Sequence, residues 1–311
     1  MFKRFLSYYK PQMGLFVADT VCALVLAAID LAFPIILRNL TGGLFTQGQA
    51  AIMQALGMIA VGLVLMYAVR CACRYFVSYW GHVMGARMES KMREDLFDQY
   101  ERFSFAYFDR NSSGDMMSRV VNDLFDICEA AHHVPEWIII CGIEIIGSFV
   151  ILFTIAPVLA LAMAVVTAAF AVIMFWQNMR MREVFSDNRK KISGINAQLQ
   201  DSLAGMRVVK SFANEQTERA KFRASNDRYL SSKENMYHAM GVYTATYGLL
   251  SGVLYVIVVL LGGWLVAQGQ LQAVDMATFA LYISLFCTPL ETLVNSAETY
   301  QKAIAGFKRM D

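Results

Sequence analysis

Three long stretches without a charged residue constrain this chain more than any other feature. Residues 39–69, 145–179 and 235–274 contain no Asp, Glu, Lys or Arg. A helix needs about 20 residues, at ~1.5 Å each, to cross the ~30 Å hydrocarbon core of a membrane, so each stretch can hold more than one span. Only 17% of the 311 residues are charged and 57% are hydrophobic. Because a soluble protein usually has about 25% charged residues, the composition excludes an ordinary water-soluble enzyme.

Polar and turn residues divide these stretches into separate membrane spans. We expect breaks at residues 41–43 (Thr-Gly-Gly), at Pro157 and at residues 268–270 (Gln-Gly-Gln). With the neighbouring segments, the expected spans are six, at about residues 14–37, 52–76, 134–155, 158–179, 240–266 and 276–298. The sequence therefore predicts an all-α membrane protein in which residues 1–311 form one transmembrane domain embedded in the lipid bilayer.

The distribution of positive charge predicts the orientation. Of the 27 Lys and Arg residues, 24 lie in residues 1–13, 81–130, 177–238 and 300–311, whereas the opposite connections hold only Arg38. By the positive-inside rule we expect both termini and both long connections to be cytoplasmic, in a multi-pass protein of the plasma membrane. The connections 81–130 and 177–238 lack proline and are rich in helix formers, which predicts that the spans continue into the cytoplasm as long helical stalks.

The cysteines and histidines give no local pattern of a bound metal or a disulfide framework. No C-x-x-C pair and no His cluster at metal-ligand spacing occurs in the sequence. We therefore expect no metal site, and we expect packed thiols at the six cysteines, which are Cys22, Cys71, Cys73, Cys128, Cys141 and Cys287. The net charge of +2 gives no reason to expect nucleic-acid binding.

Each long connection has a distinctive segment near its middle. In the first, residues 109–114 have the composition of a turn, and Ser113 is expected to cap a short helix with Asp115 in its first turn, where negative charge complements the helix dipole. In the second, three apolar residues lie among charged neighbours, namely Val208, Val209 and Phe212. An apolar patch far from the membrane suggests a docking surface.

These two segments resemble those of the membrane domain of ATP-binding cassette (ABC) exporters of the six-span type I family. The first resembles the family pattern F-x-x-F-D…G-D-x-x-S-R-x-x-N-D, matched by Phe105, Phe108, Asp109, Gly114, Asp115, Ser118, Arg119, Asn122 and Asp123. The second resembles N-x-x-L-x-E-x-L-x-G-x-x-V-V-K-x-F-x-x-E, matched by Asn196, Leu199, Leu203, Gly205, Val208, Val209, Lys210, Phe212 and Glu215. Asp201 stands where the family usually has Glu, which keeps the charge. The resemblance covers essentially the whole chain.

The resemblance implies a type-1 ABC exporter transmembrane fold with specific partners. In this family the membrane domain pairs with a second copy or a homologous half, and coupling helices at the stalk tips rest on nucleotide-binding domains. It implies a first coupling helix at about residues 109–117 and a second at about 207–216. The coupling contacts that it implies are Phe108, Asp109, Ser113, Gly114, Asp115, Arg119, Asp123, Asp201, Gly205, Val208, Val209, Lys210, Phe212 and Glu215.

The chain has no P-loop. The pattern G-x-x-x-x-G-K-[S/T], whose backbone N–H groups and Lys hold phosphates, does not occur. We therefore expect no catalytic residue and no cofactor in this chain, and we expect ATP and Mg²⁺ to bind a nucleotide-binding domain that follows residue 311. The complete protein would then be an ATP-hydrolysing half-transporter, and the alternative is a stand-alone permease subunit.

Polar residues inside the spans are candidates for a substrate pathway. Ionisable groups at bilayer depth are costly unless they face water or a partner. The candidates are Asp30, Glu144, Tyr247, Ser251, Glu291, Asn295 and Glu298. Asp19 and Asp30, 11 residues apart, share a helix face. For Arg70 and Arg74 we expect snorkelling to the membrane interface. For Tyr247, close packing between helices is the alternative to substrate contact.

Taken together, these features predict an ATP-driven exporter that alternates between inward- and outward-facing states. The expected cargo is an amphipathic small molecule, a lipid or a peptide, and the carboxylates favour a cationic one. Two alternatives remain, a secondary transporter driven by an ion gradient and a membrane scaffold that transports nothing.

Overall fold

The computed structural model describes residues 7–310, apart from the side chains of residues 297, 298, 301, 309 and 310. The long helices are α2 (Met13–Gly42), α3 (Gln49–Phe76), α4 (His82–Glu101), α7 (Leu124–Ile155), α8 (Pro157–Ala204), α10 (Glu215–Ile257) and α12 (Ala273–Met310). The short helices are η1 (Lys10–Gln12), η2 (Leu44–Thr46), α5 (Phe105–Arg110), α6 (Ser113–Ser118), α9 (Met206–Ser211) and α11 (Gly263–Ala267). Three π-helical turns complete the described part, which contains no strand: η3 (Val77–Gly81), η4 (Arg119–Asp123) and η5 (Val258–Gly262).

Six helical segments are long and apolar enough to cross a membrane. They are Ser7–Thr46, Gln49–Glu101, Ser113–Ile155, Pro157–Ala204, Glu215–Ala267 and Ala273–Ser296. Each expected span falls on one of these segments, so the prediction of an all-α membrane fold with six spans is confirmed.

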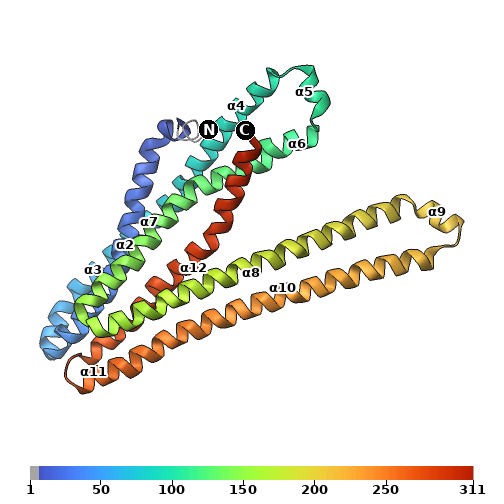
Figure 1. The fold of residues 1–311 in the computed structure, drawn as a ribbon. Helices are drawn as coiled ribbons and strands as arrows, with labels where there is room; N and C mark the ends of the chain where they lie inside the picture. Colours follow the sequence, from blue (N-terminus) through green and yellow to red (C-terminus); the bar gives the residue numbers. More distant parts are fainter. Residues whose placement is uncertain (1–6, 311) are drawn as a thin grey trace. The chain divides into compact units, whose positions relative to one another are not determined.

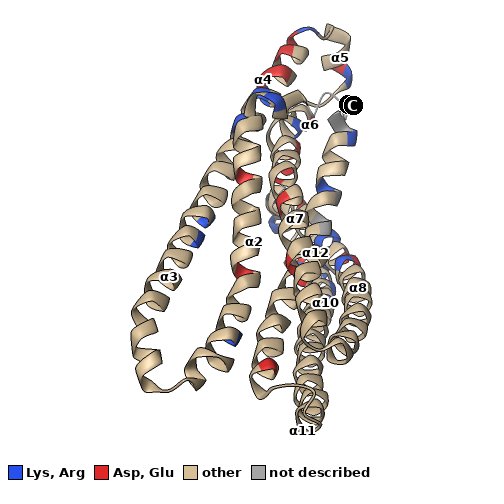
Figure 2. Cartoon of the chain, turned by 90° about the vertical axis from the view of Figure 1, so that its left-hand side faces the viewer, with Lys and Arg blue, Asp and Glu red and all other residues tan. Residues whose placement is uncertain are grey.

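The helices continue well beyond the apolar stretches, as the absence of proline in both long connections led us to expect. α3, η3 and α4 form one helical run from residue 49 to 101, and α8 alone has 48 residues. Figure 2 shows that charged residues are frequent along α4 to α6, whereas most of the ribbon of α2 and α3 is uncharged. The stalks are therefore direct extensions of the spans.

The chain divides into two compact units, residues 1–164 with 255–311, and residues 165–254. In the first unit α12 packs along α7, and both pack against α2. The core there contains the fully buried Tyr282, whose hydroxyl donates a hydrogen bond to the carbonyl oxygen of Leu31 at 2.6 Å. In the second unit α8 and α10 lie side by side in opposite directions and are joined by α9 (Figure 1).

An ion pair joins the end of α2 to the start of α12. Arg38 Nε donates to Asp275 Oδ1 at 2.5 Å, and Asp275 Oδ2 accepts the backbone N–H of Gln272 at 2.9 Å. The Asp275 side chain is only 4% exposed and lies in the first turn of α12, where its charge complements the helix dipole. Arg38, the single cation of the expected outer connections, therefore has a structural partner.

Helices α2 and α7 approach each other closely at Gly147. A Cβ atom on Gly147 would lie 2.5 Å from Cδ1 of the buried Leu31. We predict that Gly147→Ala lowers the free energy of unfolding by about 1–3 kcal/mol, the usual cost of overpacking a core. Thermal unfolding of the intact protein in detergent measures the effect.

Gly142 on the same helix provides the control, because a Cβ atom there would meet nothing within 4 Å. Gly142→Ala should leave stability unchanged or raise it by up to about 1 kcal/mol through helix propensity. Equal melting temperatures for the two variants would contradict the proposed contact.

Candidate functional site

The first candidate surface is the tip formed by α5 and α6. The hydroxyl of Ser112 accepts the backbone N–H of Gly114 at 3.2 Å, so Ser112 caps α6. The expectation that Ser113 is the cap is therefore wrong by one residue, because Ser113 already has its place in the helix. Asp115 lies in the first turn of α6, as expected.

The turn before α6 is shorter than expected. Asp109 belongs to α5, which runs to Arg110, so only residues 111–112 separate the two helices. The backbone N–H and the side-chain amide of Asn111 both donate to the carbonyl oxygen of Tyr107, at 3.1 and 2.8 Å. These bonds extend the helical turn over the residues that composition assigned to a loop.

The first tip exposes large apolar side chains. Phe105 is 91% exposed, and Phe108 and Met117 are also exposed. Phe108 was an expected contact, whereas Phe105 and Met117 were not. Phe105 and Met117 could have been predicted from the sequence, because each is an apolar residue within a charged, loop-like stretch. The same pattern marked the second tip.

Asp123 does not lie on this exposed surface. Its side chain is buried, and its carbonyl oxygen lies 3.3 Å from the position of a Cβ atom on Gly306 of α12. Arg119 and Asp123 begin and end the π-helical turn η4, which changes the helical register. Asp123 therefore lies beside α12 and outside the exposed tip surface, and its expected role as a coupling contact stays a prediction.

The second candidate surface is the tip formed by α9. Gly205 separates α8 from α9, and its carbonyl oxygen accepts the N–H groups of Val208 and Val209 at 2.9 and 3.1 Å. α9 ends at Ser211, and Ala213 has a φ of 52° in the left-handed region, which reverses the chain into α10. The expected helix at about 207–216 is therefore a shorter helix followed by a turn.

This turn presents the expected apolar patch. Phe212 is 79% exposed, and Val208, Lys210 and Leu203 are also exposed, whereas Val209 is half-buried. These apolar side chains lie outside the apolar stretches and are exposed to water. A partner that covers them would remove their apolar surface from water, which is energetically favourable. The geometry of the tip therefore fits a docking surface.

A polar clamp holds α8 and α10 together beneath the second tip. The hydroxyl of Ser202 donates to Glu218 Oε1 at 2.5 Å, and Lys221 Nζ lies 3.3 Å from Glu218 Oε2. These two donors hold the pKa of the Glu218 carboxyl below its ordinary value. Asp201 is exposed and lines the shallow groove beside this clamp, and Glu215 begins α10.

Among the candidate pathway residues, Asp30 and Glu144 lie close to the same arginine. Arg70 Nε donates to Asp30 Oδ1 at 2.8 Å, and Nη2 donates to Oδ2 at 3.2 Å. Glu144 of α7 interacts electrostatically with Asp30, Arg70 and Arg74. Arg70 thus has a carboxylate partner within the protein, which would offset the cost of a charge inside a span. The expected snorkelling of Arg70 stays a prediction.

Asp19 and Asp30 do share a face of α2, as expected. Asp30 contacts Arg70 of α3, and Asp19 Oδ1 lies 3.2 Å from the position of a Cβ atom on Gly81, in the same helical run. Both carboxylates therefore point toward α3 and its continuation.

The remaining candidates lie on two other helices. Glu291 is partly buried and Asn295 is exposed on α12, and the side chain of Glu298 lies outside the described residues. Tyr247 and Ser251 are partly buried on α10 in the second unit. The ring of Tyr247 packs against Phe170 with centroids 5.7 Å apart, so helix packing accounts for this tyrosine.

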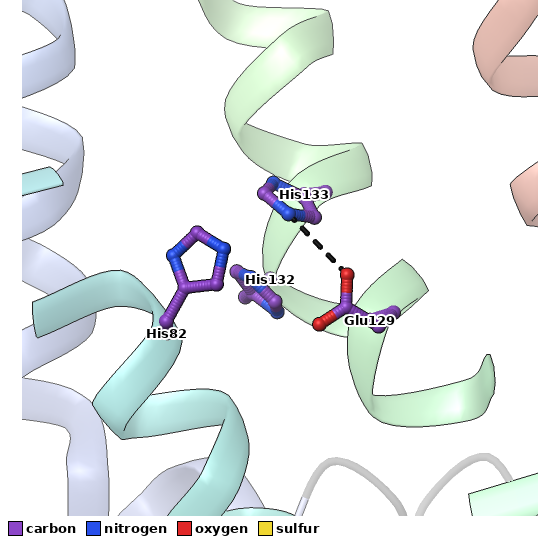
Figure 3. A group of neighbouring side chains, drawn as sticks. All are labelled: His82, Glu129, His132 and His133. Atoms are coloured by element: carbon purple, nitrogen blue, oxygen red, sulfur yellow. Dashed lines mark ion pairs between the residues drawn. The ribbon is translucent and has the colours of Figure 1, made fainter. Parts of the chain in front are cut away.

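One group of side chains was missed by the sequence analysis. His82 lies beside Glu129, His132 and His133 of α7, and one potential ligand atom from each lies within 4.8 Å of the others (Figure 3). The local signal was Glu129 followed by His at the third and fourth positions, which places all three on adjacent faces of a helix. His82 lies 47 residues before Glu129 in the sequence, so local spacing did not reveal the group.

Comparison with known proteins decides the family. The model for the ABC transporter transmembrane region matches residues 16–290. The chain belongs to this family. This match confirms the family that the two tip segments indicated by their resemblance to ABC exporters.

Several bacterial relatives align along almost all of this transmembrane region. The uncharacterized ABC transporter ATP-binding protein YwjA of Bacillus subtilis is 32% identical over 308 residues, which is 99% of the chain and 53% of that protein. An ATP-dependent lipid A-core flippase of Syntrophus aciditrophicus is 23% identical over 317 residues, 100% of the chain and 51% of the flippase. A putative multidrug export ATP-binding/permease protein, YgaD of Bacillus subtilis, is 23% identical over 313 residues, which is 99% of the chain and 54% of that protein. The chain thus spans about half the length of these relatives.

The pair Asp30–Arg70 yields a second prediction. Asp30→Asn and Arg70→Gln should each destabilise the intact protein, because each leaves one charge without its partner in a partly buried position. The double variant should recover part of the loss, with a coupling free energy of about 1–3 kcal/mol. Thermal unfolding of the four proteins closes the cycle, and additive effects of the two substitutions would argue against the ion pair.

Proposed function

We propose that this chain is the membrane-spanning permease half of an ATP-driven exporter. The observation that carries the proposal is the pair of tips at the ends of long helices, each with an exposed apolar patch centred on Phe105 and Phe212. Relatives whose names describe ATP-binding transporters and ATP-dependent flippases support an ATP-binding partner for these patches. The tips would rest on nucleotide-binding domains, which would bind ATP and Mg²⁺.

The proposed orientation places both tips and both termini in the cytoplasm. The excess of Lys and Arg in residues 81–130 and 177–238 supports it, since such residues gather on the cytoplasmic side of a membrane. ATP is available in the cytoplasm, so this orientation gives nucleotide-binding domains their substrate.

The proposed cycle needs two membrane halves, either two copies of this chain or this chain with a homologous partner. Closure of the nucleotide-binding domains on ATP would move the tips, and the continuous helices α8 and α10 would transmit that movement as rigid levers into the membrane. The pathway would then switch between inward- and outward-facing states, because ATP binds one of the two states more tightly.

The proposed cargo is amphipathic: a small molecule, a lipid or a peptide. The names of the flippase and multidrug relatives support this class. The pairing of Asp30 with Arg70 removes one of the carboxylates that favoured a cationic cargo, so the proposal leaves the sign of the cargo charge open.

Transport by the intact protein in proteoliposomes tests the function directly. A fluorescent phospholipid analogue and a fluorescent amphipathic cation serve as probes. We predict that at least one probe moves only when ATP and Mg²⁺ are supplied on the tip side, and that a proton ionophore leaves the movement unchanged. Movement driven by an ion gradient without ATP would favour a secondary transporter, and no movement of either probe would favour a scaffold.

The second tip supplies a more specific prediction. Phe212→Ala removes the most exposed aromatic side chain of the α9 tip and should reduce ATP-driven probe transport by roughly tenfold, the effect of about 1.4 kcal/mol of lost coupling free energy. ATP hydrolysis by the same preparation should persist, so the ratio of transport to hydrolysis is the quantity to measure.

Phe222→Ala is the matched control, since Phe222 is also exposed but lies ten residues after Phe212 in the sequence, within α10 and away from the tip. It should leave the ratio of transport to hydrolysis unchanged. A normal ratio in Phe212→Ala would exclude the α9 tip as the coupling contact.

A further inference from the structure

Three imidazoles and a carboxylate converge between α4 and α7. The ring centroids of His82 and His132 are 4.9 Å apart, those of His132 and His133 are 4.0 Å apart, and those of His82 and His133 are 5.0 Å apart. Glu129 lies one helical turn before the two adjacent histidines, and its Oε2 is 3.4 Å from His133 Nε2. Figure 3 shows the four side chains close together, with His132 between His82 and Glu129.

Backbone hydrogen bonds fix the orientation of two of these rings. His132 Nδ1 lies 3.0 Å from the carbonyl oxygen of Cys128, and His82 Nδ1 lies 2.6 Å from that of Ser78. A carbonyl oxygen only accepts, so these two contacts require the hydrogen on Nδ1, and Nε2 then carries a lone pair whenever the ring is neutral. Metal-binding histidines hold their second nitrogen in this way, which sets the tautomer and orients the lone pair.

The lone pair of His132 has no partner among the described residues. His132 is 4% exposed, and its Nε2 is buried without a hydrogen bond. Nδ1 of His133 differs, since it lies 3.8 Å from Oε2 of Glu136. Leaving a buried polar group unpaired costs about 1–3 kcal/mol. A cation at the centre of the group would satisfy the His132 nitrogen.

The surrounding helices are shaped to admit these side chains. A Cβ atom on Gly85 would lie 2.9 Å from His132 Nδ1, so only glycine there lets the imidazole approach α4. The π-helical turn η3 ends immediately before His82, and such turns are frequent at functional sites. Asp19, 5% exposed with Oδ1 unpaired in the described part, interacts electrostatically with His82 and His133 and adds negative charge nearby.

We propose that His82, Glu129, His132 and His133 form a binding site for a divalent transition-metal ion, with Zn²⁺ as the best match. Imidazole nitrogen with one carboxylate suits Zn²⁺, Ni²⁺ or Cu²⁺, whereas Ca²⁺ and Mg²⁺ require mainly oxygen ligands. A tetrahedral ion with ligand distances of ~2.1 Å brings the ligand atoms to about 3.4 Å from one another. Small side-chain rotations therefore suffice, since these atoms already lie within 4.8 Å.

The bound ion would connect two helices that lead to the first tip. His82 is the first residue of α4, and the other three ligands lie on α7, which is joined to α6 by η4. The ion would thus hold the base of the first stalk in a fixed arrangement. This site is independent of the proposed transport function, because metal binding is measured without ATP or cargo.

Metal titration of the intact protein tests the site. The protein is purified in detergent without a polyhistidine tag, stripped with EDTA and desalted, and then titrated with Zn²⁺ by calorimetry and with Co²⁺ by visible absorption. We expect a saturable site for one ion per chain that His82→Ala weakens by at least about tenfold, as loss of a metal-binding side chain does. Because His82 is exposed, this variant leaves the core intact.

Two further variants make the result specific. Glu129→Gln keeps the shape of the side chain and should also weaken binding. His238→Ala is the matched control, because His238 is the one remaining histidine of the chain and lies on α10 in the second unit; it should leave binding unchanged.

Three outcomes would overturn the proposal. The first is the absence of saturable Zn²⁺ binding in the wild-type protein. The second is equal affinity in the wild type, His82→Ala and Glu129→Gln. The third is a thiolate-to-Co²⁺ charge-transfer band in the near ultraviolet, which would assign the ion to cysteines instead.

Discussion

The lack of water in the hydrocarbon core determines most of this architecture. A backbone N–H or C=O group that enters lipid must find its hydrogen bond within the protein, and a helix provides that bond within its own segment. Each helix therefore crosses its apolar span as one continuous segment, and on the side of the two long connections it continues past that span. At ~1.5 Å per residue the 48 residues of α8 extend about 72 Å, more than twice the ~30 Å of the hydrocarbon core. Tips far from the apolar stretches follow directly from this continuity.

The same lack of water explains where the polar side chains of the first unit lie. Arg38 pairs with Asp275 near one end of α2, and Arg70 pairs with Asp30 further along the same helix. The histidine group with Glu129 lies between α4 and α7. In each case residues far apart in sequence meet across helices, so these contacts fix the packing of helices whose apolar surfaces alone would not specify one arrangement.

The sequence predicted those features that depend on local composition. Stretches without charge located the six spans, and the absence of proline predicted that the helices continue into the stalks. Single apolar residues among charged ones marked Val208 and Phe212, which the structure exposes. Helix ends were less accurate, because one hydrogen bond from Ser112 decides which serine is the cap.

Contacts between helices were beyond such an analysis. The partner of Arg70 lies 40 residues earlier, and His82 meets a pair of histidines about 50 residues later. Asp123 is buried at the end of a π-helical turn that no composition pattern signals. In each case the decisive fact is which helix faces which, and that is a property of the folded bundle and not of a local segment.

Photo-crosslinking from the second tip tests the central claim most directly. A crosslinking amino acid at Val208 of the intact protein, with a control at Val172 in the apolar part of α8, is followed by mass spectrometry of the products. Both positions are exposed in the structure. The account predicts that position 208, and not position 172, crosslinks to a nucleotide-binding domain, with a yield that changes when ATP is added. Crosslinks from position 208 to lipid or to unrelated proteins only, with no nucleotide-binding domain among the products, would contradict it.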